Sequence, residues 1–269
     1  MKYYIGVDLG TSAVKLLLMD QEGQVVNIVS REYPLSFPHP GWSEQNPEDW
    51  WEQSKEGIKE LISKIDATEV AGISFGGQMH GLVILDENDQ VIRPAILWND
   101  GRTTKETDYL NQVIGKEKLS EYTANIAFAG FTAPKLLWVK ENEPDIYAKI
   151  DKIMLPGDYI AMKLSGVVNT TISGLSEGMF WDFTRNEPAK FLLDYYGFST
   201  YVIPDIVPTF SVQSTVSKSA AEELGLKEGT PIAYRGGDQP NNALSLNVFD
   251  PGEIASTAGT SGVVYGVLG

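Results

Sequence analysis

Residues 6–15 have the sequence Gly-Val-Asp-Leu-Gly-Thr-Ser-Ala-Val-Lys, and apolar runs flank this stretch at residues 3–5 and 14–19. Two apolar runs joined through Gly-Thr-Ser predict a β-hairpin with these three residues at its tip. Such a tip offers backbone N–H groups and two hydroxyls with little steric bulk, which suits a phosphate oxygen. The carboxylate of Asp8 lies in an apolar strand and needs a partner, such as a cation held beside a phosphate.

The same pattern recurs near the C-terminus. Residues 5–14 align without a gap on residues 254–263, so that a second Gly-Thr-Ser follows a second apolar run. Two such hairpins far apart in one chain indicate a duplicated unit, with a nucleotide lying between two halves of a molecule. Because short matches are common, two unrelated hairpins with the same turn residues explain this pattern equally well.

Composition excludes several classes of partner and site. The 269 residues include 36 acidic and 21 Lys or Arg side chains, and the net charge of −15 argues against nucleic acid or an anionic membrane as a partner. There is no cysteine, which excludes disulfides and thiolate metal sites, and two histidines argue against a multi-histidine zinc site. No apolar run approaches the length of a membrane span and no signal-type apolar core precedes Asp8, so we expect a cytoplasmic protein.

A polar trio follows the next predicted strand. Residues 70–75 are apolar and lead through Gly-Gly to Gln78, Met79 and His80. Residues at strand ends, on loops held by a rigid sheet, are where binding groups tend to lie. Gln78 and His80 can hydrogen-bond sugar hydroxyls while Met79 packs on a carbon chain. The alternative, that His80 satisfies a neighbouring carbonyl group, is slightly favoured by the residues alone.

A glycine pair also precedes an acid near the end of the chain. Residues 231–234 predict a strand, and Arg-Gly-Gly-Asp-Gln-Pro-Asn-Asn follows at residues 235–242. We expect the two glycines to turn the backbone sharply and to leave room for a ligand beside Asp238, with the positive end of a following helix aimed there. In phosphoryl transfer to an alcohol a carboxylate accepts the hydroxyl proton, a task that suits Asp238. Capping the helix is the alternative role.

The remaining elements are predicted from their own local signals. Helices are expected at residues 46–65, with Asn46 as N-cap, at residues 102–113, and from Thr132 onward. The Trp-Asn-Asp turn at residues 98–100 either lines the pocket of Met79 and His80 or caps the helix that begins near residue 102. Residues 173–183 are expected to form a loop, and neither of their acids, Glu177 and Asp182, is assigned a catalytic role.

Several of these stretches together resemble the FGGY family of carbohydrate kinases, and within it the xylulokinases. They are residues 6–12, the second Gly-Thr-Ser, Gln-Met-His at 78–80, Trp-Asn-Asp-Gly-Arg at 98–102, Phe-Thr-Ala-Pro-Lys-Leu-Leu-Trp at 131–138 and Gly-Gly-Asp at 236–238. The resemblance implies an α/β, ribonuclease H-like domain of the actin, Hsp70 and hexokinase superfamily, with a mixed central sheet flanked by helices. It implies a sugar-binding N-terminal domain over residues 1–247 and the start of a nucleotide-binding C-terminal domain over residues 248–269.

The resemblance also implies an activity, the phosphorylation of D-xylulose to D-xylulose 5-phosphate by ATP. Asp238 would be the catalytic base, and Asp8 would help to place Mg²⁺ through water. Gln78, Met79 and His80 would bind the sugar. Two tips would hold the phosphates of ATP: Gly10, Thr11 and Ser12 on one side, and Gly259, Thr260 and Ser261 on the other.

Other functions are weighed against this one. Many xylulokinases have Asn-Ala-Ala after the aspartate, whereas this chain has Gln-Pro-Asn-Asn at residues 239–242, so a kinase of ribulose, fuculose, gluconate or glycerol is the nearest alternative. The Gln-Met-His trio speaks against glycerol. A non-enzymatic actin-like ATP switch would share the hairpins but has no reason to carry Gln-Met-His or Gly-Gly-Asp. A Rossmann dehydrogenase is excluded because no Gly-x-Gly-x-x-Gly follows the first strand, and no P-loop pattern is present.

Chain length adds one expectation. FGGY kinases are considerably longer, and their second domain supplies most of the adenine site. We therefore expect this chain to be an N-terminal portion that keeps the sugar contacts, lacks a complete ATP site and is a poor kinase alone. Homodimers are common in the family, and a homodimer is expected on that ground only.

Overall fold

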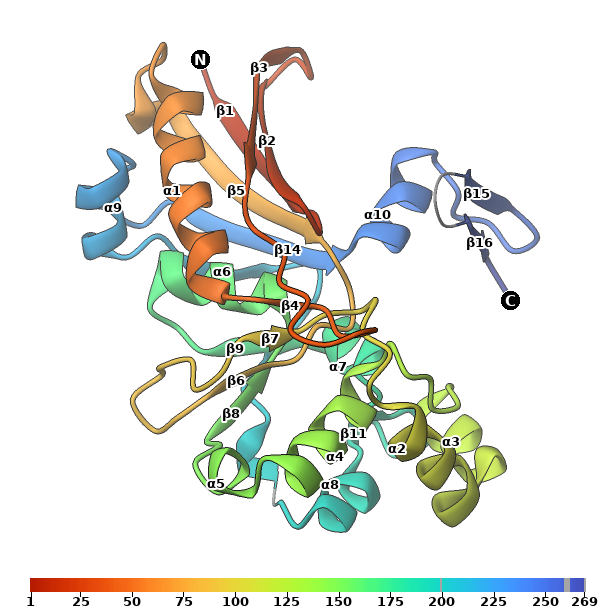
Figure 1. Ribbon diagram of the computed structural model, residues 1–269. Helices are drawn as coiled ribbons and strands as arrows, with labels where there is room; N and C mark the ends of the chain where they lie inside the picture. Colours follow the sequence, from red (N-terminus) through yellow and green to blue (C-terminus); the bar gives the residue numbers. More distant parts are fainter. Residues whose placement is uncertain (199, 259–261, 269) are drawn as a thin grey trace.

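A computed structural model describes residues 1–198, 200–258 and 262–268 of the protein. Its centre is a six-stranded mixed sheet with the order β13-β14-β5-β1-β2-β3 (Figure 1). The first three strands form an antiparallel meander, β5 and β14 continue the sheet parallel to β1, and β13 closes it antiparallel to β14. The strands span Tyr3–Leu9 (β1), Ala13–Asp20 (β2), Val25–Glu32 (β3), Val70–Gly77 (β5), Val212–Thr215 (β13) and Pro231–Gly237 (β14). The predicted hairpin with a Gly-Thr-Ser tip is therefore present, inside the predicted mixed sheet.

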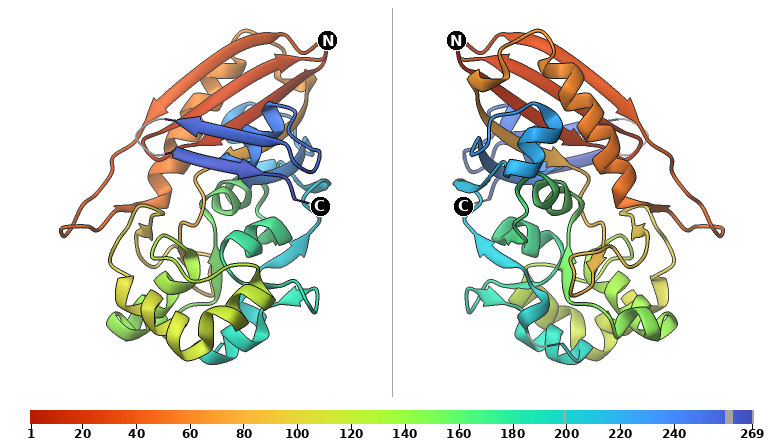
Figure 2. Two further views of the ribbon diagram at one scale, coloured as in Figure 1. Left: turned by 90° about the vertical axis from the view of Figure 1, so that its right-hand side faces the viewer. Right: turned by 90° about the vertical axis from the view of Figure 1, so that its left-hand side faces the viewer.

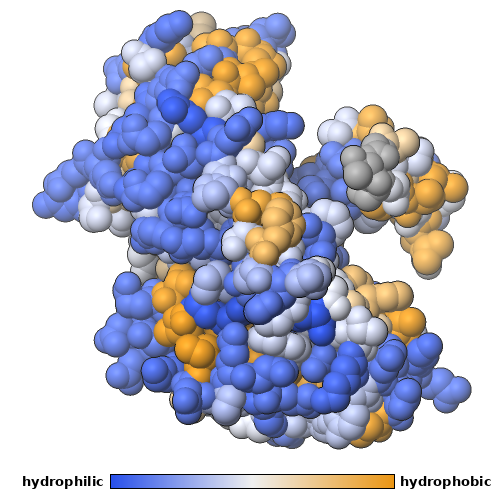
Figure 3. All heavy atoms as spheres, viewed as in Figure 1, coloured by the Kyte–Doolittle hydropathy of each residue, from blue (hydrophilic) through white to orange (hydrophobic). Residues whose placement is uncertain are grey.

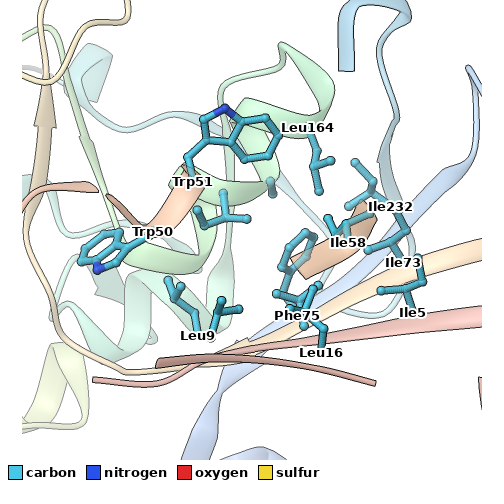
Figure 4. Close-up of a cluster of buried hydrophobic side chains, with 14 of the residues drawn as sticks. Ile5, Leu9, Leu16, Trp50, Trp51, Ile58, Ile73, Phe75, Leu164 and Ile232 are labelled. Carbon is cyan, nitrogen blue, oxygen red and sulfur yellow. The ribbon is translucent and has the colours of Figure 1, made fainter. Parts of the chain in front are cut away.

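Three helices cover one face of this sheet (Figure 1): α1 (Pro47–Ile62), α6 (Pro156–Ser165) and α9 (Lys218–Leu224). Alternate residues of β1 and β2 point into the core beneath them, where Leu9 and Leu16 share one apolar cluster with Trp50 and Ile58 of α1 (Figure 4). The side chain of Asn46 accepts a hydrogen bond from the Glu48 amide, which confirms the predicted N-cap.

A second group of helices packs below the sheet around its own apolar core (Figure 2). Its helices are α2 (Thr104–Leu110), the π-helical turn Asn111–Gly115, α3 (Lys116–Thr123), α4 (Thr132–Asn142), α5 (Pro144–Tyr147), α7 (Ile172–Glu177) and α8 (Lys190–Tyr196). Short strand pairs connect the two parts: β4 (Glu44–Gln45) with β7 (Ala95–Ile96), β6 (Val83–Leu85) with β8 (Lys152–Met154), β9 (Asn169–Thr171) with β12 (Asp205–Val207), and β10 (Trp181–Asp182) with β11 (Glu187–Pro188).

Some local predictions differ from the structure. Helix α1 ends at Ile62, three residues early, and the helix expected at residues 102–113 begins at Thr104 and passes into a π-helical turn. The loop expected at residues 173–183 contains α7, because the Thr171 hydroxyl caps the Gly174 amide at 3.1 Å and starts a helix. No helix among the described residues is long and apolar enough to cross a membrane.

The C-terminal segment leaves the body of the molecule. Helix α10 (Asp238–Ser245) follows β14 directly, as predicted, and leads to the antiparallel pair β15 (Ile254–Ala258) and β16 (Gly262–Gly266). The pair is antiparallel, as β1 and β2 are, and its strands flank the second Gly-Thr-Ser, whose residues lie outside the described part of the chain. The hairpin protrudes beside the sheet, and apolar side chains such as Ile254 and Val264 gather on its surface (Figure 3).

Gly77 is needed where β5 passes β1. A Cβ atom at this position would lie 2.8 Å from the Leu9 carbonyl oxygen and 2.9 Å from its Cβ, both in the neighbouring strand. We therefore expect Gly77→Ala to lower the free energy of unfolding by about 1–3 kcal/mol through overpacking. Urea denaturation followed by tryptophan fluorescence measures this.

Gly157→Ala is the matched control for that experiment. Gly157 lies in the first turn of α6, and nothing lies within 4 Å of the position that a Cβ atom would take there, so this variant should keep or slightly raise the free energy of unfolding. Equal urea midpoints for Gly77→Ala and the wild type would contradict the close approach.

Candidate active site

The candidate site lies where the central parallel strands end. Register pairs Asp8 with Gly76 and Gly76 with Gly236, so the backbone of Asp8 is two strand spacings, about 10 Å, from β14. Asp8 and Asp238 line one hollow of about 660 Å³ on the sheet face that the helices α1, α6 and α9 leave open. The structure therefore brings together the two acids that the sequence placed 230 residues apart.

The first tip is held from several sides. The Gln45 side-chain amide donates to the Thr11 carbonyl at 2.6 Å, and its oxygen accepts from the Trp50 indole at 2.8 Å. The Trp98 indole donates to the Thr11 hydroxyl at 2.9 Å. Ser12 is exposed, and Thr11 can still donate its own hydroxyl proton, so both hydroxyls remain usable by a ligand. The second tip, residues 259–261, lies outside the described residues.

His80 has one ring nitrogen occupied and one free to accept. Its Nδ1 lies 2.9 Å from the carbonyl oxygen of Glu177, and because a carbonyl only accepts, Nδ1 carries the proton and Nε2 is an acceptor. The ring stacks on Phe131 with centroids 4.3 Å apart. Burial lowers the pKa of His80 from 6.5 to about 4, so the ring is neutral at pH 7. Both explanations offered for His80 are therefore compatible: it satisfies a carbonyl and keeps an acceptor.

A buried lysine fixes the backbone of His80, which has a positive φ of 62°. The ammonium group of Lys135 is fully buried in α4 and donates to the His80 carbonyl at 2.8 Å and to the Gly130 carbonyl. The Thr132 hydroxyl donates to the same His80 oxygen at 3.1 Å. Burial lowers the pKa of Lys135 to about 7. These donors stabilise a backbone conformation that a non-glycine residue rarely adopts.

The glycine pair before Asp238 has a different role from the one predicted. Neither Gly236 nor Gly237 has a positive φ, and β14 runs straight into α10 without a sharp turn. A Cβ at Gly237 would lie 2.5 Å from Cγ of Met79, and one at Gly236 would lie 2.5 Å from the Tyr234 hydroxyl. The glycines therefore leave room for neighbouring side chains, and they do not form a sharp turn.

Asp238 is the first residue of α10, and Gly237 occupies the N-cap position, so Asp238 is not the helix cap. Burial raises the pKa of Asp238, and the negative charge of Asp8 raises it further, whereas hydrogen bonds from Gln239 lower it. Desolvation likewise raises the pKa of Asp8 although its side chain lies at an exposed position, and Lys15 opposes this rise. A carboxylate with a raised pKa is a stronger proton acceptor.

Glu177 is a site residue that the sequence analysis missed. Its backbone carbonyl holds His80, and its Oε2 atom is buried without a hydrogen-bond partner among the described residues. Burial raises the pKa of Glu177 well above 4.5, and the charges of Asp158 and Asp238 add to the rise. No local pattern marks this residue, because its place depends on how α7 packs against β14.

Two other acids serve the fold. Asp158, in the first turn of α6, is buried and accepts hydrogen bonds from the Leu155 amide at 3.3 Å and the Thr170 hydroxyl at 2.8 Å. Asp100 accepts from the Ser43 amide at 2.6 Å and pairs with Arg102 at 2.7 Å. The turn at residues 98–100 does not cap α2, whose N-cap is Thr103. Trp98 contacts the first tip, and Asp100 is structural.

A cation would find few protein ligands here. The described part of the chain contains no cluster of three or more His, Cys, Asp or Glu side chains that could enclose a metal. Asp8 supplies a carboxylate facing the same hollow as the first tip, which fits Mg²⁺ held largely by water and phosphate oxygens and does not fit an all-protein metal cage.

Comparison with known proteins identifies the family. The N-terminal domain of the FGGY family of carbohydrate kinases matches residues 3–245. A xylulose kinase of Bacillus subtilis is 40% identical over 266 residues, which are 98% of this chain and 53% of that protein. A crystal structure described as a xyloylose kinase from Brucella ovis superposes with a TM-score of 0.91 at 36% identity, covering 97% of this chain and 54% of the other.

A gluconate kinase structure from Lactobacillus acidophilus superposes with a TM-score of 0.93 at 26% identity, covering 98% of this chain and 53% of that one. The superpositions confirm the predicted fold, with its mixed sheet and flanking helices. The chain spans about half the length of the relatives it matches. It belongs to the FGGY family of carbohydrate kinases and corresponds to the N-terminal domain of that family.

Proposed function

We propose that this chain forms the sugar-binding half of a kinase that transfers the γ-phosphoryl group of ATP to O5 of D-xylulose. One observation carries the proposal. Asp238, a carboxylate with a raised pKa, shares a hollow with Asp8. It directly follows β14, and the neighbouring strand β5 leads directly to Gln78, Met79 and His80. Phosphoryl transfer needs such a base together with positioned phosphates and little other chemistry from the protein. The xylulose kinase relatives support D-xylulose as the sugar.

In the proposed reaction, Asp238 accepts the proton of the O5 hydroxyl as this oxygen attacks the γ-phosphorus. The bond between the γ-phosphorus and the bridging oxygen breaks, and ADP leaves. His80 accepts a hydrogen bond from another sugar hydroxyl through Nε2, and Met79 packs on the carbon chain. Backbone amides and the hydroxyls of Thr11 and Ser12 hold phosphate oxygens. Mg²⁺, when bound near Asp8, neutralises phosphate charge.

Kinases of related sugars are the second candidate, and the gluconate kinase neighbour favours that class. Calorimetric titration of the chain with D-xylulose, D-ribulose, glycerol and D-gluconate separates these substrates. Saturable binding of D-xylulose that weakens about tenfold in a His80→Ala variant is expected, because one sugar hydrogen bond is lost. Tighter binding of another polyol would keep the family and change the substrate.

Asp238→Asn should separate binding from chemistry. The amide keeps the size of the carboxylate but cannot accept the hydroxyl proton as a base, so we expect turnover to fall by about 10²–10⁴-fold while sugar affinity changes little. ADP release measured in the full-length protein, together with sugar calorimetry, tests this. Asn242→Asp, at another position lining the same hollow, controls for charge and should not restore turnover in the double variant. Wild-type turnover in Asp238→Asn would overturn the role of Asp238.

The depressed pKa of His80 predicts a specific loss of stability in acid. The His80 side chain takes up a proton near pH 6.5 in the unfolded state but only near pH 4 in the folded state. Its contribution to the free energy of unfolding is therefore fully present above pH 6.5 and is lost as the pH drops toward 4. Between pH 7 and pH 5 this loss is about 2 kcal/mol, and a His80→Gln variant should lack it. Urea denaturation at both pH values measures the difference.

His39→Gln is the matched control, since it removes the other histidine, which is exposed. This variant should keep the wild-type loss between pH 7 and pH 5. If His80→Gln loses as much stability as the wild type, His80 is not held neutral in the folded protein.

A further inference from the structure

A second, smaller hollow lies on the other side of Gly76, between the ends of β5 and β14 and the helices α6 and α7. Its polar lining comes from Gln78, Asp158, Glu177 and Arg235, and its interior has room for about two water-sized groups. None of the activity proposed above uses this hollow.

The hollow contains polar atoms that the chain itself does not satisfy. Gln78 and Arg235 are only 5% and 4% exposed, yet Oε1 of Gln78 and Nε of Arg235 have no hydrogen-bond partner among the described residues. Nη1 of Arg235 has only the Asp158 carboxylate as an ion-pair partner, 3.6 Å away. Oε2 of Glu177 likewise has no hydrogen-bond partner among the described residues. Buried polar atoms of folded proteins are nearly always hydrogen-bonded. Three side chains that leave donors and acceptors unpaired in one hollow indicate that groups from outside the chain occupy it.

The charges in the hollow favour uncharged groups. The Arg235 guanidinium lies 3.6 Å from the Asp158 carboxylate and also donates to the Asn169 side chain, so its charge is balanced within the protein. Burial raises the pKa of Glu177, which favours the neutral form of its carboxyl, and a neutral carboxyl can donate a hydrogen bond. An entering carboxylate would add an unbalanced negative charge in a desolvated place. A hydroxyl group, which both donates and accepts, matches Glu177, Gln78 and Arg235.

The hollow is continuous in the chain with the sugar site. Gln78 precedes Met79, Gly237 precedes Asp238, and the Glu177 carbonyl holds His80. The Glu177 carboxyl is close enough to Asp238 for the two charges to interact. Groups bound here would therefore lie near the sugar residues, across Gly76 from the hollow that Asp8 and Asp238 line.

We propose that this hollow is a hydroxyl-binding subsite that takes the end of an uncharged sugar remote from the hydroxyl facing Asp238, and that Glu177 is its specificity residue. The inference rests on the proposed sugar kinase function and deepens it. For D-xylulose phosphorylated at O5, the remote end carries the C1 hydroxyl and the C2 carbonyl. A sugar acid presents a carboxylate at its remote end and is disfavoured.

Calorimetry with a matched pair of sugars tests the subsite. The wild type should bind 1-deoxy-D-xylulose, which lacks the C1 hydroxyl, about tenfold more weakly than D-xylulose, and D-gluconate at least as weakly. Glu177→Ala should bind D-xylulose about tenfold more weakly and leave 1-deoxy-D-xylulose nearly unchanged, so that the discrimination disappears. Glu177→Gln, which keeps a neutral donor, should retain most of it. Glu121→Ala, at an exposed glutamate, is the control.

The outcomes separate the two proposals. Equal losses for both sugars in Glu177→Ala would mean that Glu177 only supports the fold or His80, and this overturns the subsite. Undiminished discrimination in that variant would mean that the hollow holds water alone, which overturns it as well. If the wild type binds neither sugar, the proposed function fails and the subsite fails with it, whereas sugar binding without discrimination leaves the kinase proposal intact.

Discussion

The site depends on a packing constraint at four glycines of the strand ends. Gly77 passes close to the Leu9 backbone, and the other three leave room for neighbouring side chains. Gly76 and Gly77 of β5 lie in register with Gly236 and Gly237 of β14 and with the end of β1. A Cβ at any of these four positions would lie within 3 Å of a neighbouring atom. Without side chains at these points, the three strands end together and both hollows open beside the same short stretch of backbone. This packing constraint places the acids, the histidine and the first tip around one region.

Polar side chains buried beneath that region hold its loops in place. Gln45 joins the first tip to the Trp50 indole and to Gln78, and Lys135 holds the His80 carbonyl. Burying an amide or an ammonium group is costly unless its hydrogen bonds are made, so each of these groups fixes its partners in one arrangement. The rigidity of the loops therefore comes from buried donors rather than from regular secondary structure, which suits loops that must present ligands at fixed positions.

Sequence patterns predicted the elements whose formation depends on interactions between residues close together in the chain. Asn46 and Pro47 marked the start of α1, and the apolar runs around Gly10 marked the hairpin, because caps and alternation act within a few residues. The two-residue strand β4 escaped, since it exists only through its pairing with β7, a partner distant in the sequence. The site shows the same division. The sequence placed Asp8, Gln78–His80 and Asp238 at strand ends, but Glu177 and Arg235 meet only through the packing of α7 on the sheet, and the role of the glycine pair was misjudged for the same reason.

Electrostatics explains how an acidic protein can serve a reaction of anions. The chain carries a net charge of −15, and its larger hollow presents Asp8 and Asp238, with Lys15 as the one cation in the described lining. A bare polyphosphate entering this hollow would meet two carboxylates whose mutual repulsion already raises the pKa of Asp238. Phosphates compensated by a divalent cation avoid most of that repulsion, while the backbone amides of the first tip add attraction without adding charge. In the proposed reaction, burial is the main cause that strengthens Asp238 as a base, and the negative charge of Asp8 adds to it. The same charge repels a free nucleotide, so that selection of the metal-bound nucleotide and activation of the sugar hydroxyl share one electrostatic contribution.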